Sequence, residues 1–161
     1  MWFVPVWVNC IELCVVFVAF ITLALFARVL HLYEALHINC KLLLYSLTFA
    51  LFIITATYTC ELIIVLSGTK LPKKEEIQEF PFLRSMWFLH ESAYAFTSTI
   101  TLCLSMERLI ASSNARYSCT TWSTALNIIV LPLAASGSIT FGYYIHFREY
   151  GQGKWQLRHR H

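Results

Sequence analysis

The chain has 161 residues, of which 58% are hydrophobic and only 13% are charged, and its formal net charge is +3. A soluble domain carries about 25% charged residues, so this composition excludes an ordinary soluble protein and predicts a membrane protein. The net charge is too small and too dispersed for a nucleic-acid-binding protein.

Four apolar segments are long enough to cross a bilayer as helices, which takes about 20 largely apolar residues. To within a few residues, we expect these helices at 3–30, 40–67, 86–110 and 120–147. The hydrocarbon core holds no water to satisfy backbone polar groups, so each segment is predicted to be α-helical. The prediction is an all-α, multi-pass membrane helix bundle over residues 1–147, followed by a polar tail over 148–161.

The segments between these helices are short and carry most of the charged residues. The loop at 68–84 contains two prolines and the run Lys-Lys-Glu-Glu, so we expect it to be exposed. Pro132 is expected to bend the fourth helix. The six cysteines form no CxxC pair, and most lie in or beside apolar runs, so we expect neither a disulfide framework nor a zinc site.

The third segment carries a polar stripe, which we define as Glu91, Tyr94, Ser98, Thr101, Ser105 and Arg108. Spacings of three and four residues place these side chains on one face of a helix, over about 25 Å. Unpaired polar groups are costly against lipid, so we expect this face to lie against other helices or a water-lined cavity. The alternative is that the Ser and Thr residues only make hydrogen bonds between helices.

The stripe ends at Glu107-Arg108, in the stretch SMERLIASSNARY, where Ala111 and Tyr117 follow. A third membrane helix that closes on an acid and an arginine resembles the seven-helix G-protein-coupled receptors. More narrowly, the stretch resembles the nematode serpentine chemoreceptors of the Sra and Sre-like class. The resemblance covers the first four helices, so the chain resembles the N-terminal portion of such a receptor, a truncated form of that fold.

This resemblance implies a chemosensory receptor in the cell membrane that binds a small molecule and couples to a heterotrimeric G protein. Coupling would involve Glu107, Arg108 and Tyr117. In such receptors the acid and the arginine form a local ion pair, and the arginine is released on activation. The resemblance also implies an extracellular N-terminus and a cytoplasmic 107–121 loop.

The distribution of basic residues favours the opposite orientation. The side that holds loops 28–41 and 107–121 carries Arg28, Lys41, Arg108 and Arg116. The other eight of the 12 Lys and Arg residues lie on the opposite side, half of them in the polar tail. The positive-inside rule would then place the N-terminus in the cytoplasm, but without the tail the two sides are equal. Our prediction follows the receptor resemblance.

Three glutamates lie in three different predicted helices: Glu12, Glu61 and Glu91. Because successive helices reverse direction, we expect the three carboxylates at similar depth on one side of the membrane. Carboxylates within a membrane are costly, and they face the protein interior or pair with a partner. We therefore predict a cavity for a cationic or hydrogen-bond-donating ligand. It would be lined by Glu12, Glu61, His90, Glu91, Tyr94 and Ser98.

Two alternatives stay open. Each acid could instead reach the membrane surface or pair with a basic residue of the 68–84 loop. The whole chain could be a four-helix structural or accessory membrane protein without ligand or signalling activity.

We expect no enzymatic activity, no cofactor and no metal site, since His31 and His37 do not share a helical face. The expected partners are membrane lipid, a small-molecule ligand and a G protein, and not nucleic acid.

Overall fold

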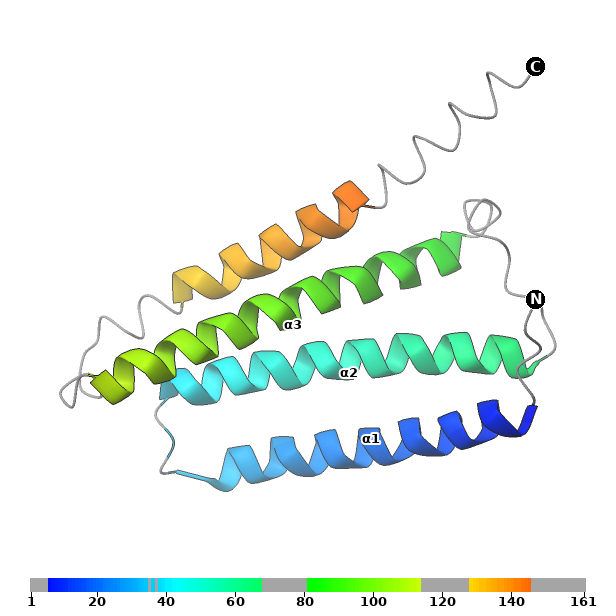
Figure 1. The fold of residues 1–161 in the computed structure, drawn as a ribbon, viewed down its shortest axis with the longest axis horizontal. Coiled ribbons are helices and arrows are strands. Elements are labelled where there is room, and N and C mark those ends of the chain that lie inside the picture. The colour runs from blue at the N-terminus through cyan, green and yellow to red at the C-terminus, as the bar shows by residue number, and fades with distance from the viewer. Residues whose placement is uncertain (1–5, 35, 37, 68–80, 114–127, 146–161) are drawn as a thin grey trace, which may run out of the picture.

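The structure is a computed structural model that describes residues 6–34, 36, 38–67, 81–113 and 128–145. Within these residues it is all-helical, and the predicted all-α helical bundle is confirmed. The helices are α1 (Val6–Leu32), α2 (Ile38–Leu66), α3 (Pro81–Ser113) and a fourth helix, Ile128–Ile145 (Figure 1).

Three of the described helices are long and apolar enough to cross a membrane: α1, α2 and the fourth helix. The chain is therefore a membrane protein by length and composition. Helix α3 has 33 residues, but histidine, glutamate and many Ser and Thr side chains interrupt its apolar run. It lies between α2 and the fourth helix and packs against both (Figure 1).

Successive helices run in opposite directions and lie side by side in chain order (Figure 1). Helix α1 packs against α2, and α2 packs against α3. We call the end where α1 begins, α2 ends and α3 begins the N-terminal end. The loop end is the opposite one, where the segment after Leu32 connects α1 to α2 and where α3 finishes.

The buried core lies where α2, α3 and the fourth helix meet. Leu43 and Ile100 are fully buried and pack with Ala134. Partly buried apolar side chains surround them: Leu47, Phe96, Cys103, Leu104 and Leu131. On the other side of α2, the Phe20 and Phe52 rings meet edge to face, with ring centroids 5.2 Å apart, and join α1 to α2.

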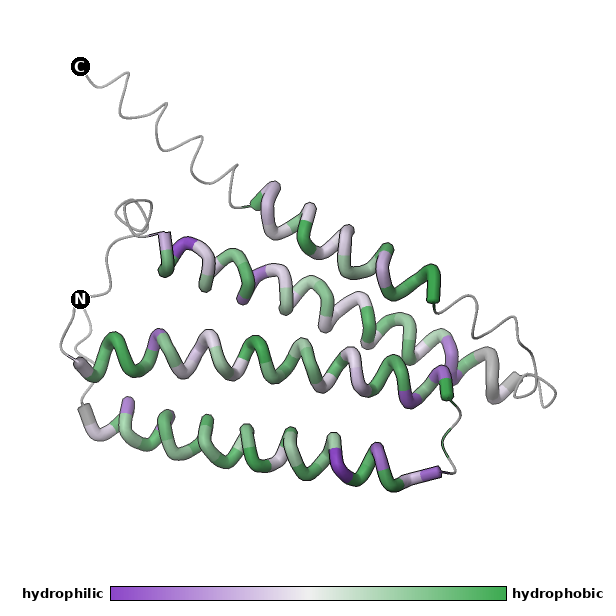
Figure 2. Tube along the Cα trace, turned by 180° about the vertical axis from the view of Figure 1, so that it is seen from behind, coloured by the Kyte–Doolittle hydropathy of each residue, from purple (hydrophilic) through white to green (hydrophobic). Residues whose placement is uncertain are grey.

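Helix α1 exposes apolar side chains along most of its length, and Figure 2 shows its middle as mostly hydrophobic, with hydrophilic residues towards both ends. The exposed side chains on α1 include Trp7, Ile11, Val15, Phe17, Val18, Ile21, Leu25, Phe26 and Val29. Lipid tails are as apolar as these side chains, so exposure to lipid carries no hydrophobic penalty. This surface suits a helix at the edge of a membrane bundle.

The helix boundaries differ from the predicted ones mainly in α3, which begins at Pro81 rather than near residue 86. Proline favours the first position of a helix because its ring fixes the backbone angle and the N–H it lacks would be unpaired there. The fourth helix runs through Pro132. Most of the predicted 68–84 loop, residues 120–127 and the polar tail lie outside the described residues.

The fourth helix approaches α3 closely at Gly142. A Cβ atom added there would collide with the Ser92 hydroxyl and would touch the Ser92 backbone, whereas one added at Gly137 meets nothing within 4 Å. We predict that Gly142→Leu lowers the free energy of unfolding in detergent by about 1–3 kcal/mol, because it forces the two helices apart.

Gly137→Leu is the matched control, since both substitutions change helix propensity equally in the same helix. It should leave the unfolding free energy at or above that of the unchanged protein. Equal destabilisation by the two variants would show that the close approach at Ser92 does not hold the helices together.

Candidate functional site

A hydrogen bond at the N-terminal end joins α2 to α3. Thr57 Oγ1 lies 2.7 Å from His90 Nδ1, and Thr57 is buried. The same hydroxyl lies 2.9 Å from the Ile54 carbonyl oxygen. A hydroxyl has one proton to donate, so when Thr57 donates to that carbonyl, His90 must donate its Nδ1 proton to Thr57. The contact thus ties the position of the histidine proton to the hydroxyl of the neighbouring helix.

Two further side chains complete what we call the interhelical cluster, formed by Thr57, Glu61, His90 and Tyr94. Glu61 follows Thr57 by four residues and so shares its face of α2. It is half-buried and lies close enough to His90 for an electrostatic interaction. Tyr94 is one turn beyond His90, and the two rings meet edge to face with centroids 4.9 Å apart.

Glu12 belongs to a neighbouring contact between α1 and α2. The Tyr58 hydroxyl donates a hydrogen bond of 3.1 Å to Glu12 Oε2. Tyr58 also lies within electrostatic range of Glu61. The three carboxylates predicted at one depth do lie at the same end, because α1, α2 and α3 alternate in direction (Figure 1). Glu12 and Glu61 flank one tyrosine there.

Most of the polar stripe of α3 lies on an exposed face of the helix, and in the described residues the prediction that it faces other helices holds only at Arg108, which reaches α2. Glu91, Ser98, Thr101, Ser105 and Arg108 are all exposed. The physical reason is that the hydroxyls are satisfied within their own helix. Those of Ser98, Thr101 and Ser105 donate to the carbonyl four residues earlier, at 3.1, 2.8 and 2.9 Å.

The predicted cavity residues are therefore only partly brought together. Glu61, His90 and Tyr94 meet in the interhelical cluster. Glu12 contacts Tyr58 beside them. Glu91 and Ser98 are exposed on α3, where Ser98 donates to the Tyr94 carbonyl.

At the loop end, Arg108 binds α2 by reaching Cys40. Its guanidinium donates a 3.0 Å hydrogen bond to Cys40 Sγ, and Cys40 is only 2% exposed. Glu107 and Arg108 are adjacent in α3, and adjacent residues on a helix do not face each other. The hydrogen-bond partner of Arg108 is instead Cys40 on α2. The Oε2 oxygen of Glu107 is buried and has no hydrogen-bond partner among the described residues. Tyr117, the third predicted coupling residue, lies outside them.

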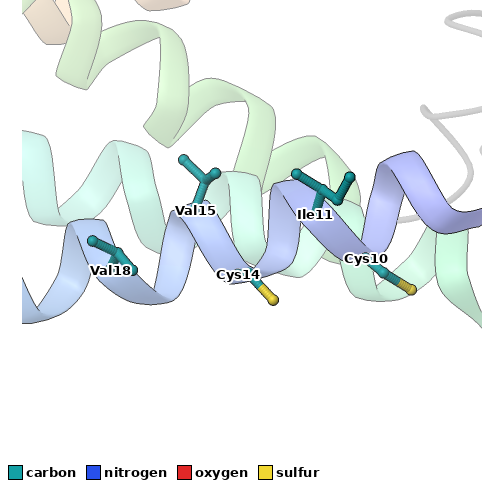
Figure 3. A pocket seen from close by; sticks show the side chains of 5 residues that line it. All are labelled: Cys10, Ile11, Cys14, Val15 and Val18. Carbon is teal, nitrogen blue, oxygen red and sulfur yellow. The ribbon is translucent and has the colours of Figure 1, made fainter.

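Two apolar depressions are prominent in the described residues, and the interhelical cluster lines neither of these two. One of about 400 Å³ lies on the outer face of α1, where Cys10, Ile11, Cys14, Val15 and Val18 surround it (Figure 3). Because lipid covers such a face, we assign it no ligand. The other, of about 250 Å³, lies between α1 and α2.

The described residues hold no group of three His, Cys, Asp or Glu side chains able to bind a metal ion. The five described cysteines are free thiols. Comparison with protein-family models, with curated proteins and with solved structures finds no match to this chain. The geometry of the described residues is therefore the basis for the function proposed below.

Sequence reasoning missed Cys40, Thr57 and Tyr58, which supply the α2 side of the three hydrogen bonds between helices described above. Thr57 could have been identified from the sequence, because its spacing of four residues from Glu61 places both on one face of a helix. No pattern in the sequence distinguishes Cys40 from the other cysteines.

We predict a coupling free energy of about 0.6–1.7 kcal/mol between Thr57 and His90, the range for hydrogen bonds between membrane helices. It would be measured as a double-mutant cycle with Thr57→Val and His90→Phe, using unfolding in detergent. Thr55→Val with His90→Phe is the control, because the Thr55 hydroxyl donates to the Leu51 carbonyl of its own helix. A Thr57 coupling no larger than the control would contradict a stabilising contact.

Proposed function

We propose that this chain is a receptor-like, multi-pass membrane protein that senses a small molecule and signals to a heterotrimeric G protein. The observation that carries the proposal is that α2 and α3 are joined by polar contacts at both ends. Thr57 holds His90 at the N-terminal end, and Cys40 holds Arg108 at the loop end. His90 and Arg108 are 18 positions apart, a distance of about 27 Å along the helix, close to the thickness of the hydrocarbon core.

The ligand would bind at the N-terminal end, beside the interhelical cluster. The carboxylates of Glu12, Glu61 and Glu91 give that end an excess of acceptors within the membrane-spanning segments. A ligand with a cationic or hydrogen-bond-donating group is therefore favoured. Such a group would compete with His90 for Glu61, which lies close enough to that ring to interact with it.

The signal would pass along α3 as a rigid helix. A ligand that displaces His90 from Thr57 removes one of the two polar contacts between α2 and α3. A small rotation or shift of α3 then separates Arg108 from Cys40 and frees the guanidinium at the loop end. In this proposal Glu107, Arg108 and Tyr117 form the surface that meets the G protein.

The alternative function, a structural or accessory membrane protein without a ligand, is favoured by a different observation. The Ser and Thr hydroxyls of the polar stripe are satisfied by their own backbone. The two apolar depressions described above also lie away from the cluster. A chain with this role would need the interhelical contacts for stability alone.

The two functions are separated by a response assay with Glu61→Gln. In cells that display the chain with G proteins, we screen small organic amines for a second-messenger response. Glu61→Gln should raise the half-maximal concentration of an active amine by roughly 10–100-fold, the effect of losing a charge-assisted hydrogen bond. Surface expression of the variant should be unchanged.

Glu34→Gln is the control, because Glu34 lies at the loop end, far from the cluster. Its dose–response curve should overlay that of the unchanged chain. An equal loss in both variants would contradict a ligand site at Glu61. A chain that reaches the cell surface and answers none of the amines would support the accessory role.

The proposed orientation has an extracellular N-terminus and a cytoplasmic loop end. We expect glycosylation acceptor sites inserted at residues 70–80 to be modified in cells, since that loop would be extracellular. Sites inserted at 112–118 should stay unmodified. Modification of the 112–118 sites alone would reverse the orientation and agree with the count of basic residues.

A further inference from the structure

An apolar groove lies between α1 and α2 towards the loop end. It has a volume of about 250 Å³. Its walls are Leu23, Ala24 and Ala27 from α1, and Tyr45, Thr48, Phe49 and Phe52 from α2. The two alanines, one helical turn apart, leave room opposite the aromatic side chains of α2. The groove thus follows the helices within the membrane-spanning segments.

One polar group in the groove has no partner in the described residues. The Thr48 hydroxyl donates to the Leu44 carbonyl, 2.7 Å away. The Tyr45 hydroxyl makes no hydrogen bond within the part of the chain that the structure describes. An unsatisfied hydroxyl is costly where no water is present. The groove therefore suits an occupant that is largely apolar but carries an acceptor at the depth of Tyr45.

Two basic residues lie one helical turn beyond the groove residues, towards the loop end. Arg28 follows Ala24 by four residues and Lys41 precedes Tyr45 by four, so each cation shares the face of a groove residue, one turn nearer the loop end. Neither forms an ion pair with an acid in the described residues. Glu34, in the connection between α1 and α2, is exposed and pairs with neither.

We propose that this groove binds an anionic phospholipid. One acyl chain lies between α1 and α2, Tyr45 donates to an ester or phosphate oxygen, and the charged headgroup lies between Arg28 and Lys41. Apolar contact alone does not select an occupant, because lipid tails attract apolar side chains no more strongly than they attract other lipid tails. The choice of an anionic lipid therefore rests on the two cations, Arg28 and Lys41. Basic pockets between membrane helices bind acidic headgroups by the same charge complementarity.

A second copy of the chain fits the groove less well. Copies inserted in one membrane share an orientation, so a symmetric dimer through this face would bring two Arg28 and two Lys41 side chains together. Like charges at close range oppose such an interface. In the orientation proposed above, the loop end faces the cytoplasmic leaflet, which is the leaflet rich in anionic lipid.

The test uses the full chain purified in a neutral detergent and titrated with phosphatidylserine or with phosphatidylcholine. Native mass spectrometry measures the fraction of chains that retain a lipid. We expect phosphatidylserine to be retained in preference, and the preference to fall as salt concentration rises. Arg28→Gln and Lys41→Gln should each weaken phosphatidylserine binding about fivefold, and the double variant about 25-fold.

Arg84→Gln is the matched control, because it removes one cation at the N-terminal end of α3, and it should leave the preference unchanged. Ala24→Leu fills the groove and keeps the charges, and it should also weaken binding. Equal retention of the two lipids by the unchanged chain would overturn the proposal. An equal loss in Arg84→Gln would overturn it too, because it would mean that net charge alone attracts the lipid.

If Arg28→Gln and Lys41→Gln fail to fold, the salt titration of the unchanged chain decides. A preference for phosphatidylserine that does not change with ionic strength would overturn the site. None of these readouts requires the chain to sense a ligand or to meet a G protein. The lipid site and the proposed receptor function therefore stand or fall separately.

Discussion

A bilayer supplies no water to the polar side chains of the helices that cross it, and this constraint governs the arrangement described here. Each intramembrane hydroxyl, imidazole or carboxylate needs a partner from its own helix or a neighbouring one. Most Ser and Thr hydroxyls donate to a carbonyl of the preceding turn, as those of Thr55 and Ser105 do. The side chains that reach another helix, His90 and Arg108 among them, set how α3 lies against α2.

The helix packing has a different origin from the polar contacts. Burial of apolar surface gives no net attraction between helices in lipid, so close fit and small residues hold them together. Gly142 allows the fourth helix to approach Ser92 of α3, and Ala134 packs with Leu43 and Ile100 in the core. The exposed apolar face of α1 needs no cover in this environment.

Composition and the length of the apolar runs were enough to predict the four helices and their alternating directions. The same alternation placed Glu12, Glu61 and Glu91 at one end. The orientation of the α3 stripe could not be predicted, because periodicity shows which residues share a face but not which neighbour covers it. Ser98, Thr101 and Ser105 can remain exposed, since each hydroxyl donates to a backbone carbonyl of its own helix. The partners of His90 and Arg108 depend on the rotation of α2, which no sequence spacing encodes.

Because each helix packs against the one before it in the chain, contacts form between segments close in sequence. Such low contact order favours fast assembly, and chains fold from the N-terminus during synthesis. The α1–α2 hairpin could therefore close as soon as α2 has entered the bilayer, before α3 is made. The Tyr58–Glu12 hydrogen bond would then form cotranslationally, and the free face of α2 would serve as the template on which α3 docks.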